Sequence, residues 1–145
     1  TSHDDLERLN LTTLAVSASS ERVLETTLQG RAFSQTTAAI WGGDDVNACY
    51  PIAVGVAAAR RKLDLEITAA LYLHAFASNL VSAAVRAIPL GQTDGQRVLS
   101  ALLPLCEEIA QTTREGDLDD LGSTAFLSDI AAMRHETLQP RIFRS

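Results

Sequence analysis

Lysine and cysteine are scarce in this sequence, and basic residues are fewer than acidic ones. Lys62 is the single lysine among twelve basic residues, and eighteen acidic residues leave a formal net charge of −6. This balance lacks the positive field with which proteins bind phosphate backbones, so nucleic acid is not an expected partner. Two cysteines, Cys49 and Cys106, are too few for a disulfide framework. Such usage is typical of a reducing compartment, and we expect a cytoplasmic protein.

Strand patterns and targeting signals are also missing. Runs of strand length with alternating polar and apolar residues do not occur, whereas helix-capping residues recur, which indicates an all-α protein. At this length we expect one domain over residues 1–145, a single irregular helical bundle. No secretory signal opens the chain, and the start without Met suggests that upstream residues are missing. Residues 67–88 form the most apolar segment but include His74, Asn79 and Arg86, so they are not expected to cross a membrane.

Capping residues and helix breakers divide the chain into six expected helices. Ser19 or Ser20 is a suitable N-cap for the second, Asp64 for the fourth, and Ser123 or Thr124 for the last. The expected helices cover residues 4–17, 20–41, 51–62, 65–88, from 93 onward, and 125–137. In the fifth, Thr93 and Gln96 have the spacing of a capping box.

Two of these helices have distinctive faces. In the second, Gly30, Ser34 and Ala38 are four residues apart, which predicts a stripe where another backbone comes close. The fourth is apolar around nearly its whole circumference, and we expect it at the centre of the bundle. The fifth carries an apolar face at 4-3-4 spacing, formed by Val98, Leu102, Leu105 and Ile109.

Catalytic motifs are absent or incomplete. No phosphate-binding loop with its lysine occurs, which excludes a nucleotide hydrolase of that class. His135 and Glu136 begin a zinc-protease motif, but Gln139 stands where its second histidine belongs. We therefore expect no enzyme, no cofactor and no metal site. The alternative is a small metal-binding hydrolase or nickel carrier that uses His74 and His135 with Cys49; His74 alone fits a core histidine better, and Cys49 beside a loop could be a weak metal or oxidation site.

Two places carry more polar side chains than a connection needs. The joint between the fourth and fifth helices contains Arg86, Gln92 and Gln96. The chain ends in residues 138–145, here named the C-terminal tail, which places an aromatic residue among arginines: Arg141, Phe143 and Arg144, preceded by Arg134. That composition is typical of a protein interface, although the tail could also fold back on its own bundle.

Four stretches together resemble the urease accessory protein UreF family. They are "LQGRAF" at 28–33, "YPIAVGVAAA" at 50–59, "YLHAFASNLVSAAVRAIPLGQTDGQRVL" at 72–99 and the ending "HETLQPRIFRS". The resemblance implies an all-helical, non-catalytic protein, often a homodimer. It implies that the protein joins UreD, called UreH in some organisms, to the GTPase UreG, and that this assembly delivers nickel to apo-urease.

The resemblance also implies where partners bind. The C-terminal region implicated in UreD contact corresponds to residues 134–145, which adds His135 and Glu136 to the candidate partner-binding residues. Arg86, Gln92 and Gln96 are assigned to UreG or to the dimer contact as a hypothesis of our own. The sequence departs from the family at its start, where an N-terminal segment with an S-Y-S-x-G-L-E-like motif is not present, and at Pro140 and Ile142 in the tail.

Overall fold

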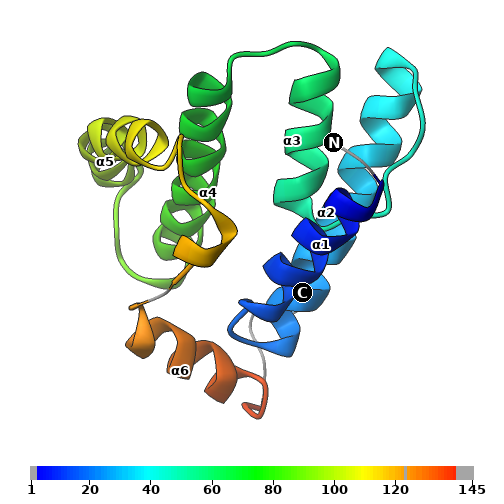
Figure 1. Cartoon of the computed structure of the whole chain (residues 1–145). Coiled ribbons are helices and arrows are strands. Elements are labelled where there is room, and N and C mark those ends of the chain that lie inside the picture. The colour runs from blue at the N-terminus through cyan, green and yellow to red at the C-terminus, as the bar shows by residue number, and fades with distance from the viewer. Residues whose placement is uncertain (1–2, 123, 140–145) are drawn as a thin grey trace. The chain divides into compact units, whose positions relative to one another are not determined.

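The structure is a computed structural model that describes residues 3–122 and 124–139. Across this part of the chain it contains helices and no strand, which confirms the predicted all-α class (Figure 1). The helices are α1 (His3–Ala15), α2 (Ser20–Trp41), α3 (Tyr50–Arg60), α4 (Leu65–Ala87), α5 (Gln92–Thr112), the 3-10 turn η1 (Leu118–Asp120) and α6 (Phe126–His135).

Helix starts follow the predicted caps where a side chain reaches the first turn. The Ser19 hydroxyl accepts a hydrogen bond from the Arg22 backbone N–H at 3.2 Å, and the Asp64 carboxylate accepts from the N–H of Ile67 at 2.9 Å. Both residues are extended, as N-caps are.

Two predicted caps are wrong. The N-cap of α5 is Gly91, which makes no side-chain cap bond, so the expected Thr93–Gln96 box does not form. Asp94 lies in the first turn instead and pairs with Arg97 at 2.7 Å. The N-cap of α6 is Ala125 rather than Thr124, while Ser123 lies outside the described residues.

The chain divides into two compact units, which are described separately. The first consists of the residues up to Ala57 together with those from Asp117 onward, and the second runs from Ala58 to Gly116. The first unit therefore contains segments from both the N-terminal and the C-terminal part of the chain. The assignment of residues 1–145 to one domain stays a prediction.

Residues 46–50, here named the clamped segment, organise the first unit. Gly30 of α2 lies so close to this segment that an added Cβ would be 2.1 Å from the Ala48 carbonyl oxygen. Four residues along the same face, the Ser34 hydroxyl accepts from the Val46 N–H at 2.6 Å. This confirms the predicted close approach of a backbone at Gly30 and Ser34.

Two further side chains hold the clamped segment. The Asn10 side-chain oxygen of α1 accepts from the Cys49 N–H at 2.8 Å, and the Thr26 hydroxyl of α2 accepts from the Tyr50 N–H at 3.2 Å. Tyr50 also meets Phe33 edge to face, with ring centroids 5.6 Å apart. The segment thus links α1, α2 and the start of α3 through its own backbone.

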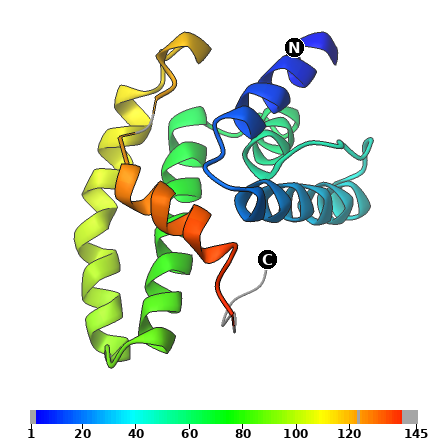
Figure 2. The ribbon, with the colours of Figure 1, turned by 90° about the horizontal axis from the view of Figure 1, so that it is seen from below.

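The second unit is built on a hairpin of α4 and α5, which run side by side (Figure 2). A Cβ at Gly95 would lie 3.0 Å from Val85 and 3.1 Å from Val81, so the two helices come close at this position. The buried face of α5 consists of Gly95, Leu99, Cys106 and Ala110.

The buried face of α5 is thus displaced by about one residue from the apolar spacing seen in the sequence. Val98, Leu105 and Ile109 are exposed, and Leu102 is half-buried. Gly95 has no side chain, which allows the two helices to approach closely at its position, and Leu99 is the large apolar residue that is buried on the same face.

Helix α4 is apolar, as predicted, but none of its residues is fully buried. By length and composition alone it could cross a membrane: its most apolar 18 residues have a mean hydropathy of 1.3, and 6% of that window is buried. Core helices of soluble proteins meet the same criterion, so it does not identify a membrane span. The central position of this helix stays a prediction.

Candidate partner-binding site

The polar joint lies at one end of the α4–α5 hairpin. Arg86 is in the last turn of α4, where its charge complements the negative end of the helix dipole. Gln92 and Gln96 are in the first two turns of α5, and all three side chains are exposed. The structure therefore brings these three predicted residues to one end of the second unit.

His135 and Glu136 belong to the first unit, at the end of α6. His135 Nδ1 lies 2.6 Å from Glu21 Oε2, although 114 residues separate the two in sequence. The His135 side chain is 32% exposed and that of Glu21 20%, so this pair is largely shielded from water. A hydrogen bond to a carboxylate is stronger in such a partly buried place than in water.

Glu136 completes the junction between α6 and α2. Its Oε1 atom accepts from the Ser20 backbone N–H at 2.7 Å and from the Ser20 hydroxyl at 2.8 Å. Ser20 is the first residue of α2, so its N–H is one of the groups that the helix itself leaves without an acceptor. The carboxylate also carries the charge that the positive end of a helix favours.

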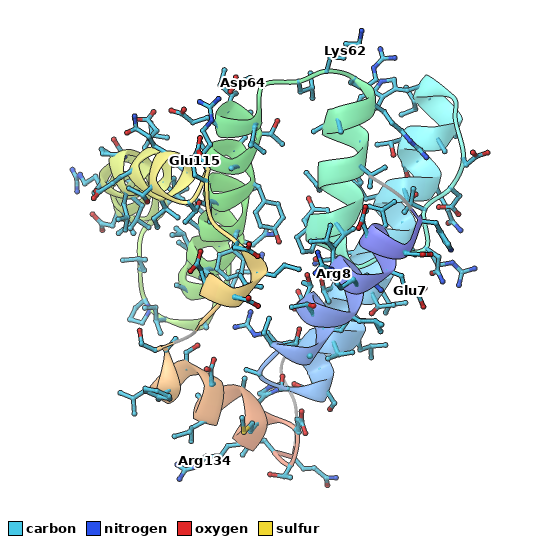
Figure 3. All side chains as sticks on the ribbon, viewed as in Figure 1. Glu7, Arg8, Lys62, Asp64, Glu115 and Arg134 are labelled. Atoms are coloured by element: carbon cyan, nitrogen blue, oxygen red, sulfur yellow. The ribbon has the colours of Figure 1, made fainter. Side chains whose placement is uncertain are left out.

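Arg134 precedes this pair and points away from α6 (Figure 3). Its side chain is exposed. Arg141, Phe143 and Arg144, the remaining candidate residues, lie outside the described residues, as does Ile142. Arg134, His135 and Glu136 are thus gathered in one unit, and the joint residues belong to the other.

Metal chemistry gains no support from the described part of the chain. There, no three side chains from His, Cys, Asp and Glu lie close enough together to hold a metal ion. His74 is half-buried on α4 in the second unit, and His135 is engaged with Glu21 in the first. Each histidine, within the described part of its own unit, belongs to no group of three such side chains.

Both cysteines are buried and free. Cys106 is 6% exposed on the inner face of α5, where it is a small buried apolar residue. Cys49 is 2% exposed, so its position beside a loop does not make it accessible to oxidants. Burial raises the pKa of its thiol above the ordinary value, despite hydrogen bonds with the Ile52 backbone and the Thr13 hydroxyl that act to lower it.

Comparison with known proteins decides the family. A model of the UreF family matches residues 1–103 of the chain. The chain belongs to the UreF family. It is 53% identical to the urease accessory protein UreF of Ruegeria pomeroyi over 141 residues and 48% identical to that of Roseobacter denitrificans over 142. A third relative, from Cereibacter sphaeroides strain KD131, is 53% identical over 131 residues.

These matches cover nearly all of the chain but not all of the relatives. They include 97%, 98% and 90% of the chain, but 65%, 64% and 62% of the three relatives. The chain thus spans less than two thirds of the length of the UreF proteins it matches. The resemblance that the four sequence stretches indicated is confirmed at the level of the family.

Ser20 and Glu21 are the residues that sequence reasoning missed at this site. Both were visible at the start of α2, one as a possible cap and the other as an acid in the first turn. Nothing local links them to His135 and Glu136, because the bonded partners are 114 and 116 positions apart in the chain. Covariation of the two positions among relatives is the kind of signal that could reveal such a contact.

Proposed function

We propose that this chain acts in urease maturation as a non-catalytic scaffold. The carrying observation is its identity of about 50% with urease accessory proteins UreF over nearly its whole length. In this role it joins UreD, or UreH, to the GTPase UreG, so that nickel is inserted into apo-urease. The scaffold works in the cytoplasm, without a membrane, nucleic acid or cofactor, and the full-length protein is a homodimer.

The C-terminal tail is the proposed contact with UreD. Arg141 and Arg144 offer planar, multiple hydrogen-bond donors, and Phe143 offers an aromatic anchor between them. Arg134, near the end of α6, extends the same region. Supporting this placement, Arg134 is exposed and directed away from its helix.

The polar joint is the proposed contact with UreG or with the dimer mate. Arg86, Gln92 and Gln96 stand together at one end of a two-helix hairpin, which offers a rigid support for hydrogen bonding. A scaffold that prefers one nucleotide state of a GTPase changes the balance of those states by its difference in affinity. Such coupling requires no bond-making group in the scaffold.

Removal of the tail tests this function. The chain without residues 138–145 is expected to lose co-purification with UreD while its helical circular dichroism stays that of the parent. A substitution outside the tail, Glu107→Ala on the exposed side of α5, serves as the control and should leave the complex intact. Persistence of the complex after truncation would contradict the tail assignment.

A further inference from the structure

The junction between α6 and α2 stands next to the proposed UreD contact, and its bonds lie within the chain. Helix α6 has ten residues, fewer than the roughly 12 to 15 at which an isolated helix becomes even marginally stable in water. It therefore depends on contacts with the rest of its unit. Bonds from His135 and Glu136 at its C-terminal end provide such contacts.

We propose that His135 and Glu136 are positioning residues, which fasten the end of α6 to the first turn of α2 and thereby set where the C-terminal tail leaves the unit. The inference rests on the proposed function, in which the tail binds UreD. In this proposal His135 and Glu136 bind Glu21 and Ser20 of α2, and they do not contact the partner protein.

The hydrogen bonds at the junction are of a kind that can hold the end of α6 against the start of α2. Ser19 already accepts from the Arg22 N–H, so the helix uses its own cap for that donor. Glu136 supplies a second acceptor from the other end of the chain and satisfies the Ser20 N–H. Its charge meets the positive end of α2, while His135 meets Glu21 one residue further along the same turn.

The junction lies close enough to the C-terminal tail to determine where the tail begins. Only Thr137 separates Glu136 from Leu138, the first residue of the tail. Because an extended residue spans at most about 3.6 Å, the tail begins within roughly 7 Å of the fastened carboxylate residue. Fastening Glu136 fixes the point at which the tail begins, so less freedom is lost when the tail binds its partner, and affinity rises without an added contact.

Hydrogen exchange of the full chain tests the fastening without any partner. Glu136→Ala removes the acceptor, and the amides of α6 are expected to exchange roughly tenfold faster or more. Glu136→Gln keeps an acceptor oxygen and should give an intermediate rate. Thr137→Ala is the matched control, since the Thr137 hydroxyl bonds only within its own turn, to the Arg134 carbonyl. The amides of residues 30–34 report that the unit is still folded.

Capture on immobilised UreD tests the positioning. Glu21→Ala, on a helix far from the tail in sequence, is expected to weaken capture as much as His135→Ala does, and the double variant should be no weaker than either. A variant of His135 that weakens capture while Glu21→Ala does not would mean that the histidine touches the partner, and would overturn the proposal.

Unchanged α6 exchange in Glu136→Ala would overturn the fastening itself. The hydrogen-exchange experiment also tests this inference independently of the proposed function, because it needs no partner. If the parent chain fails to bind UreD, the proposed function fails, and the exchange rates still decide whether His135 and Glu136 hold α6 on α2.

Discussion

Gly30 of α2 lies directly against the carbonyl oxygen of Ala48, at a distance that leaves no room for a side chain. A Cβ on residue 30 would be 2.1 Å from that oxygen and 2.6 Å from the carbonyl carbon of Cys49. Both are backbone atoms that Asn10 and Ser34 hold through neighbouring N–H groups. The clamped segment can therefore move aside only by breaking hydrogen bonds.

Replacing this glycine is expected to destabilise the first unit. Gly30→Ala should lower the free energy of unfolding by about 1–3 kcal/mol or more, because overpacking against backbone has no cheap relief. Gly55→Ala in α3 is the matched control: a Cβ there meets nothing within 4 Å, and the substitution should stabilise by roughly 0.4–1 kcal/mol. Denaturant unfolding of the two variants measures both effects, and equal stabilities would contradict the close approach.

The Ser34 hydroxyl is expected to matter for stability while a nearby threonine does not. Ser34→Ala leaves the Val46 N–H without its acceptor in a buried place, at a cost of about 1–3 kcal/mol. Thr36→Ala removes a hydroxyl that bonds only to the Ala32 carbonyl of its own helix, and should stay within about 0.5 kcal/mol of the parent. Thermal unfolding compares them. A Thr36 effect as large as that of Ser34 would show that the clamped segment does not depend on this bond.

Titration of Cys49 should give the stability an alkaline dependence. Burial raises the pKa of the Cys49 thiol in the folded state. As the pH rises past 9.0, the ordinary pKa of this thiol, the unfolded chain therefore loses the proton before the folded chain does. The stabilisation is complete below that pH and is lost as the pH climbs through the folded pKa, with a slope of at most about 1.4 kcal/mol per pH unit. The free energy of unfolding of Cys49→Ala is measured from about pH 8 to about pH 11, roughly two pH units above the ordinary thiol pKa. The variant should lack the decrease in stability that the thiol causes in the parent. An identical slope in parent and variant would argue against a buried thiol.

The isolated chain is expected to retain no stoichiometric metal. Because the described residues gather no three metal-binding side chains, nickel or zinc added and then dialysed should leave far less than one ion per chain. Elemental analysis of the parent and of His135→Ala makes the comparison. One tightly held ion per parent chain, lost in the variant, would favour a metal carrier over a scaffold.

Much of the fold could be predicted because local chemistry decides it. Ser19 and Asp64 cap helices by reaching N–H groups three residues away, and the spacing of Gly30 and Ser34 marks a face that another backbone approaches. Such signals need only a few neighbouring residues. The same reasoning failed at α5, where Gly91 rather than Thr93 is the N-cap.

What could not be predicted depends on contacts between distant residues. The spacing of the larger apolar side chains does not mark the buried face of α5, because Gly95 lies inward, where its missing side chain lets α4 come close. His135 and Glu136 carry no local sign of their partners on α2. At the candidate site the sequence therefore identified the segments, and the structure supplied their attachments within the chain.

A bridging assay tests the scaffold most directly. UreD is immobilised, UreG is added with GTP and nickel, and the recovery of UreG is measured with and without this chain. The account predicts that UreG is retained only when the chain is present and that removal of residues 138–145 abolishes its retention. Equal recovery of UreG with and without the chain would contradict the role of a scaffold between the two.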